Sequence, residues 1–253
     1  MSTKSWSVLT ITFATLAALT MFMWPLLLTA SNQSALAQSV FIALMPILLV
    51  VVLIEFGTGN LDSRRLAILG LLIALNAVIR LLGAGVSGIE TAFFLIILGA
   101  YVFGSGFGFI LGSGSLFVSA LLGAGIGPWL PFQMMAAGLV GIGAGVVSRI
   151  PTRKPLLLLC AYAVLASFVY GALMTMWTWP FLAGVGTSLS FAPGAPVSEN
   201  LLNFLRYELF TGGLLWDLGR AITTVALILL TGKTLLVTLG RVANKVSIRE
   251  PQL

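Results

Sequence analysis

The chain has 253 residues, of which 59% are hydrophobic and only 8% are charged. A soluble domain carries charge on about 25% of its residues, because water must solvate its surface. A lipid-facing surface has the opposite requirement, since a charged side chain at the centre of the bilayer costs roughly 2.5–3.5 kcal/mol. The composition, with a mean hydropathy of +1.10, therefore excludes an ordinary soluble protein. It predicts an integral membrane protein with room for about six to eight spans.

The net charge of +6 does not indicate a nucleic-acid-binding protein. The 13 lysines and arginines are scattered at the ends of apolar runs, without a basic stripe or interleaved aromatic residues. The chain has no histidine and a single cysteine, Cys160. These absences exclude histidine metal sites, Ser-His-Asp triads, an internal disulfide and a thiolate metal centre. We therefore expect no catalytic residue, no metal and no cofactor.

Two apolar runs open the chain, at residues 7–30 and 38–56, and a short polar link joins them. The tripeptide Ala35-Leu36-Ala37 in this link resembles a signal-peptidase site, which leaves cleavage of residues 1–37 as an alternative. The first run is longer than the apolar part of an ordinary signal peptide, and it ends several residues before that site. We therefore favour an uncleaved helix and predict two N-terminal transmembrane helices within residues 1–62.

Six further spans are predicted in the rest of the chain. Its apolar runs are 66–82, 91–147, 156–179 and 214–240. Glycine-rich turn signals at 112–114 and 123–131 divide the second of these runs into three short helices. A long mixed segment, 180–213, precedes the last span. The expected fold class is all-α: a polytopic membrane helix bundle with a six-helix core at 63–245, two extra helices before it, and a tail at 246–253.

The basic residues orient this bundle in the membrane. If eight helices alternate in direction, the strongly basic segments all fall on one side. They contain Lys4, Arg64, Arg65, Arg149, Arg153, Lys154 and Arg241. Short cytoplasmic loops are enriched in lysine and arginine, so this side is expected to be the inner one. We therefore predict a multi-pass protein of the cell membrane with both termini in the cytoplasm.

Ten polar or aromatic side chains converge, in this topology, on the outer end of the bundle. They are Asn76, Arg80, Trp129, Gln133, Asn203, Arg206, Tyr207, Trp216, Asp217 and Arg220. Singly, they have structural explanations: tryptophans favour membrane interfaces, Arg80 can extend toward the headgroups, and Asp217 can pair with Arg220 at i,i+3. Together, rings that stack on a planar ligand and a few directional donors are what a small-molecule pocket needs. We interpret them as candidate substrate-binding residues, with the 180–213 segment as a lid.

Small residues on the 66–82 run indicate close helix packing. Gly70 and Ala74 form a small-xxx-small pair, and Ala77 lies nearby on the same broad face. Helices in lipid gain little hydrophobic energy by associating, so close backbone contact through small residues supplies much of the attraction. These residues serve either packing within the bundle or docking of a separate membrane protein. The chain has no Walker A sequence, so ATP-driven work would need a partner.

Four segments in this order carry a resemblance to a known family. They are Ala67 to Arg80, Gly104 to Ser119, Gly127 to Gln133, and Trp216 to Ala221. Residues 64–241 thereby resemble the substrate-binding S component of energy-coupling-factor (ECF) vitamin transporters. The resemblance implies a six-helix bundle in the bilayer that captures a vitamin-like molecule from outside. It also implies docking on a transmembrane T subunit that two ATP-binding subunits drive.

The resemblance places the docking face at Gly70 and Ala74, where the family usually has two alanines. Gly70 is a mild departure from that pattern, and the two extra N-terminal helices are a second one. The first expectation for the substrate is a cobalamin-type compound or precursor, followed by riboflavin or another aromatic B vitamin.

Three other functions are alternatives to this resemblance. A secondary carrier would favour an internal inverted repeat and ionisable residues at mid-bilayer, and the sequence shows neither. An intramembrane enzyme would have to use Asp217 or Glu208 as its acid or base, because histidine is absent. A non-catalytic membrane assembly protein is the third alternative.

Overall fold

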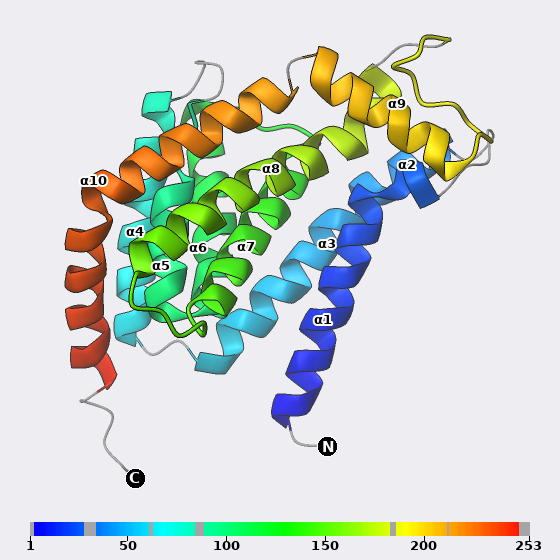
Figure 1. Ribbon diagram of the computed structural model, residues 1–253. Coiled ribbons are helices and arrows are strands. Elements are labelled where there is room, and N and C mark those ends of the chain that lie inside the picture. The colour runs from blue at the N-terminus through cyan, green and yellow to red at the C-terminus, as the bar shows by residue number, and fades with distance from the viewer. Residues whose placement is uncertain are drawn as a thin grey trace.

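The computed structural model describes residues 3–27, 34–60, 63–83, 89–182, 186–211 and 213–247. Within these ranges the chain is all-helical, with ten α-helices and no β-strand, as the composition and periodicity predict (Figure 1). The helices are α1 (Thr3–Phe22), α2 (Trp24–Leu27), α3 (Ser34–Asn60), α4 (Ser63–Gly83), α5 (Phe93–Phe103), α6 (Ser105–Ser119), α7 (Leu130–Val147), α8 (Pro155–Leu182), α9 (Val197–Phe210) and α10 (Gly213–Ser247). A π-helical turn, η1 (Ala120–Ala124), extends α6.

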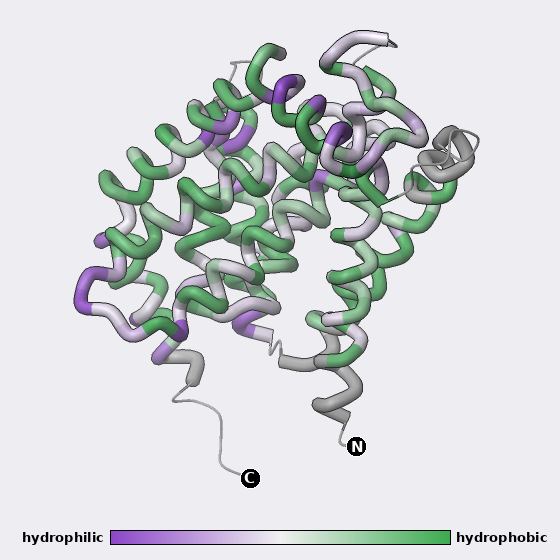
Figure 2. Tube along the Cα trace, turned by 45° about the vertical axis from the view of Figure 1, so that its right-hand side comes forward, coloured by the Kyte–Doolittle hydropathy of each residue, from purple (hydrophilic) through white to green (hydrophobic). Residues whose placement is uncertain are grey.

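Five helical segments are long and apolar enough to cross a membrane, judged by length and composition. They are Ser63–Gly83, Ser105–Ala124, Leu130–Val147, Pro155–Leu182 and Gly213–Asn244. Three shorter apolar helices, Leu9–Phe22, Ile42–Ile54 and Phe93–Phe103, accompany them within the described ranges. Figure 2 shows that apolar residues dominate all these helices, and that polar residues gather at the two ends of the bundle. The chain is therefore a multi-pass membrane protein.

The short helix α5 forms the centre of the bundle. Every residue from Phe93 to Ala100 is buried, and α5 packs against α6, α7 and α10. A helix that is apolar on all sides can be stable only where neighbouring helices or lipid surround it. Helix α10 runs along one side of this core, while α1 and α3 lie on the opposite side (Figure 1).

The turn predicted at 112–114 is wrong. Helix α6 continues through these residues, and the break falls instead at Gly104, whose φ of 92° lies in the region that favours glycine. Gly112 is needed for packing: a Cβ there would overlap the carbonyl of Ala137 on α7. Gly108 and Gly141 oppose each other in the same way, so α6 and α7 approach backbone to backbone.

The segment 180–213 contains a helix that the sequence did not reveal. Helix α9 is amphipathic and lies across the end of the bundle at the top of Figure 1. Asn200 fastens the preceding loop to it, because its side chain accepts from the Ala192 N–H at 2.8 Å and donates to the Ala192 carbonyl at 3.0 Å. Asn203 adds a donated bond of 3.2 Å to the Ser190 carbonyl. The loop and α9 thus form one body.

Aromatic contacts attach the N-terminal helices to the core. The Trp24 indole donates to the Trp177 carbonyl at 3.1 Å. The Phe22 ring meets the edge of Phe132 at 5.4 Å, and Phe132 stacks on Trp177 with ring centroids 4.0 Å apart and planes within 4°. Stacked and edge-to-face pairs add about 0.5–1.5 kcal/mol each to the energy of burial. Helices α1 and α2 therefore fix the end of α8 near α9.

The two ends of the bundle differ in charge. Helix α1 begins and α10 ends at the lower end in Figure 1, where α4 begins with Arg64 and Arg65. The turn between α7 and α8, whose sequence contains Arg149, Arg153 and Lys154, lies at the same end (Figure 1). The structure thus gathers these basic residues at one end, opposite α9.

Candidate functional site

A cavity of about 310 Å³ lies between α8, α9 and α10, at the end of the bundle opposite the basic turns. Its polar and aromatic lining consists of Thr175, Thr178, Tyr207, Thr211, Trp216, Asp217 and Arg220. Gly171, Met174, Leu182 and Gly213 complete the wall. Threonine hydroxyls, two rings and two charged groups thus face one space, which is the chemistry of a pocket for a small molecule.

Asp217 and Arg220 form an ion pair one turn apart on α10. The Arg220 guanidinium also donates to the Ser167 carbonyl on α8 at 3.1 Å. Its carbon lies 4.9 Å from the centre of the Tyr170 ring and 5.8 Å from that of Phe93, which adds a cation–π attraction. Arg220 therefore joins α10 to both α8 and α5.

Gly171 leaves the room that the Asp217 carboxylate occupies. A Cβ at position 171 would overlap all three atoms of that carboxylate. Because the ion pair lies between α8 and α10, any larger residue at position 171 would push Asp217 away from Arg220. A glycine far from Asp217 in the sequence thus fixes the geometry of one cavity wall.

Glu208 on α9 lies directly behind the cavity wall. It is 9% exposed, and a Cβ on the lining residue Gly213 would overlap its carboxylate. Burial raises the pKa of Glu208, while a hydrogen bond from Thr175 and the charge of Arg220 oppose that rise. Its Oε1 atom has no hydrogen-bond partner. Glu208 is thus a buried carboxyl whose hydrogen-bonding capacity is only partly used.

Arg80 belongs to a second polar cluster, outside this cavity. It donates to the Ser119 hydroxyl at 2.8 Å, and its Nε lies 3.7 Å from Glu90 Oε1. Glu90 also accepts from the backbone N–H of Ala92 at 3.2 Å. This cluster ties α4 to α6 and to the start of α5, which is a structural role.

Asn76, one turn before Arg80, is fully buried, and neither atom of its amide has a hydrogen-bond partner. The nearby helix α6 carries a similar case, since Ser115 is fully buried and its hydroxyl has no partner. An unsatisfied buried polar group costs about 1–3 kcal/mol. Neither residue lines the cavity between α8, α9 and α10.

Four other predicted residues also lie outside the cavity lining. Trp129 is 43% exposed beside α7, and Gln133 is half-buried on that helix. Asn203 faces the loop before α9. The exposed Arg206 donates a hydrogen bond of 3.5 Å to the side-chain oxygen of Asn203. The structure therefore brings together Tyr207, Trp216, Asp217 and Arg220, and it distributes the other six around the same end of the bundle.

Sequence reasoning missed the three threonines, Gly171 and Glu208. A threonine in an apolar helix usually bonds its own backbone, as Thr178 does to the Met174 carbonyl at 3.2 Å. Its sequence position therefore gives no sign that it also lines a cavity. The sequence did mark Glu208 as ionisable, but only the fold of α9 onto α8 shows that it is buried.

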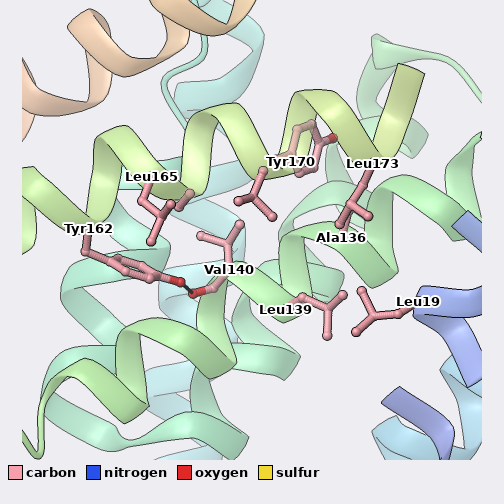
Figure 3. A pocket seen from close by; sticks show the side chains of 10 residues that line it. Leu19, Ala136, Leu139, Val140, Tyr162, Leu165, Tyr170 and Leu173 are labelled. Carbon is pink, nitrogen blue, oxygen red and sulfur yellow. Dashed lines mark hydrogen bonds between the residues drawn. The ribbon is translucent and has the colours of Figure 1, made fainter. Parts of the chain in front are cut away.

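A second cavity, of about 240 Å³, opens between α1, α7 and α8 (Figure 3). Its wall is almost wholly apolar and consists of aliphatic residues, such as Leu19, Leu139 and Leu173, and two tyrosines, Tyr162 and Tyr170. The Tyr162 hydroxyl donates to the Val140 carbonyl at 2.6 Å, so this polar group is already used. The cavity offers no set of directional groups for a polar ligand.

The proposed docking residues divide between two faces of α4. Gly70 and Ala74 are exposed, and a Cβ at position 70 would meet nothing within 4 Å. Ala77 is fully buried, so it cannot contact a second protein. Gly70 and Ala74 thus remain as the proposed docking residues on the exposed face of α4.

Among the described residues, no three histidine, cysteine, aspartate or glutamate side chains come together as metal ligands. Comparison with known proteins gives the family. The model of the ECF transporter substrate-specific component matches residues 64–238, more than half of the chain. No curated protein and no solved structure matches. Members of this family are non-catalytic transport subunits that work with a transmembrane T subunit and ATPase subunits. The chain therefore belongs to the family of substrate-specific (S) components of ECF transporters.

Proposed function

We propose that this S component captures a small B vitamin or vitamin precursor in the cavity between α8, α9 and α10. The observation that carries the proposal is the convergence of Tyr207, Trp216 and the Asp217–Arg220 pair on one space at the end opposite the basic turns. The basic turns then face the cytoplasm, as the positive-inside rule requires, and both termini lie there too. The cavity faces the extracellular side, and α9 with its loop covers it.

The size of the cavity favours a compact substrate. Its volume of about 310 Å³ is at the lower end of the roughly 300–1,000 Å³ typical of ligand pockets. A vitamin with one to three rings fits such a space, whereas a corrinoid is several times larger. We therefore place riboflavin-sized and smaller vitamins ahead of the cobalamin-type compound that the sequence first suggested.

The helices divide between two roles in this proposal. Helices α4 to α8 and α10 form the substrate-binding core, within residues 63–245. The N-terminal helices, within residues 1–62, contact α7 through Phe22 and the end of α8 through Trp24, whose ring also lies against Phe191 in the lid segment.

A thermal-shift screen over the B vitamins tests the proposed function. We expect one compound to raise the unfolding temperature of the detergent-purified protein, because a ligand that binds only the folded state stabilises it. The gain is about 2.7 kcal/mol at a hundred times the dissociation constant. A folded, monodisperse preparation that no vitamin stabilises would contradict the proposal.

The docking face gives a second prediction. Replacing Ala74 by tryptophan should abolish uptake by the assembled transporter and leave vitamin binding intact, because the bulky ring prevents close approach of the T subunit to α4. The matched control is Leu230→Trp, on a residue of α10 that is 81% exposed. This control should transport normally. Uptake assays in membranes and binding assays on the purified protein separate the two effects, and loss of binding in Ala74→Trp would assign Ala74 to internal packing.

A further inference from the structure

The charged groups around the cavity do not balance. Arg220 is already paired with Asp217, its other contacts are to the Ser167 carbonyl and to two rings, and its buried Nε has no hydrogen-bond partner. Glu208 is then a second carboxyl with no cation of its own. The Arg80–Glu90 pair at the same end is internally compensated, and Arg206 is exposed and directed to Asn203. Among the described residues around the cavity, carboxyl groups thus exceed guanidinium groups by one.

Glu208 lies next to the cavity, directly behind two of its lining residues, Thr175 and Gly213. The hydroxyl of Thr175, a lining residue, bonds to its carboxylate, and that carboxylate fills the space beside the lining residue Gly213. Its Oε1 atom is buried without a partner. A buried carboxylate without a cation of its own is costly, and a positive charge in the cavity would compensate it across the wall.

The other lining groups suit the same kind of ligand. Tyr207 and Trp216 present aromatic rings to the cavity, and aromatic faces attract cations through their quadrupoles. The hydroxyls of Thr175, Thr178 and Thr211 offer neutral polar partners. A flat, positively charged ring can thus use the rings and the carboxylate at once.

We propose that the substrate is a cationic nitrogen heterocycle whose positive charge is compensated by Glu208. This inference rests on the proposed function, since it names the chemical class of the vitamin that the cavity takes. Asp217 and Arg220 hold the wall in place, and Glu208 selects for charge. Neutral and anionic vitamins leave the extra carboxylate uncompensated and bind more weakly.

The charge balance implies a pH dependence. Burial raises the pKa of Glu208, against the effects of the Thr175 bond and the Arg220 charge. Below that pKa the Glu208 carboxyl is protonated and neutral, so it no longer attracts the positive charge of the ligand. The affinity for a fixed cation should therefore rise as the pH is raised through the titration of Glu208. Asp217 and Arg220 from α10, Thr175 from α8 and Tyr207 on α9 are the other groups around it.

The test measures binding of two fixed cations, thiamine and nicotinamide methylated on its ring nitrogen, to the full chain in detergent by calorimetry. Riboflavin serves as the neutral probe, and biotin and pantothenate as the anionic probes. Each is measured with the wild type, with Glu208→Gln and with the control Glu199→Gln. Glutamine keeps the size of the Glu208 side chain and its contact to Thr175 but removes the charge. Glu199 serves as the control because it is an exposed carboxylate on the same helix.

We expect a fixed cation to bind the wild type, and Glu208→Gln to weaken its binding by about tenfold to a hundredfold, because the attraction between the two charges is lost. Glu199→Gln should bind as the wild type does. Binding of only a neutral or anionic vitamin would overturn the charge inference and leave the proposed function standing. Unchanged cation binding in Glu208→Gln would also overturn it. If no vitamin binds the folded wild type, the proposed function fails as well.

Discussion

Replacing Arg220 by leucine is expected to destabilise the protein by about 3–5 kcal/mol, because it leaves the Asp217 carboxylate buried without its cation. The side chains of Arg220 and Asp217 are only 12% and 6% exposed, so water cannot take over the lost interactions. The variant also loses the bond from α10 to the Ser167 carbonyl on α8. Thermal unfolding in detergent measures the effect as a lower midpoint.

Two further variants show whether the ion pair is the cause. Arg206→Leu removes an exposed arginine from α9 and should change stability by no more than about 0.5 kcal/mol. The double variant Asp217→Leu/Arg220→Leu removes both charges, so it should recover much of the stability that the single variant loses. A double variant as unstable as, or less stable than, the single one would show that Arg220 acts through packing and not through its charge.

Replacing Gly141 by alanine is expected to separate α6 from α7 and to lower the unfolding temperature markedly. A Cβ at position 141 would overlap the backbone carbonyl of Gly108, and a backbone atom cannot rotate away as a side chain does. Overpacking of this kind costs about 1–3 kcal/mol, and more where the backbone must move. The unfolding midpoint and the fraction of monodisperse protein on size-exclusion chromatography measure it.

The matched control is Gly240→Ala on α10, where a new Cβ meets nothing within 4 Å. Alanine favours a helix over glycine by about 0.8–1.0 kcal/mol, so this variant should be as stable as the wild type or slightly more stable. Equal midpoints for the two alanine variants would mean that α6 and α7 can move apart freely. The close glycine contact would then have no energetic role.

The predicted site residues show which side-chain pairings the sequence can indicate and which it cannot. Asp217 and Arg220 could be paired from the sequence alone, because side chains three positions apart share a helix face. Arg80 could not be assigned in the same way, since its partner Ser119 is 39 positions away. Because of that hydrogen bond, Arg80 is not available to bind a ligand at the outer end. The bond depends on the packing of α4 against α6, which the sequence does not show.

The amino-acid pattern was enough to predict a helical membrane protein, the positions of most of its helices and the common end of its basic turns. These properties follow from hydropathy, helix length and local charge, which each segment carries on its own. The folded structure was needed to show that Gly112 is a packing contact and not a turn, that Glu208 is buried, and which residues line the cavity. Glycine serves equally at a turn and at a close helix contact, and burial depends on segments distant in the chain, so no local pattern contains the answer.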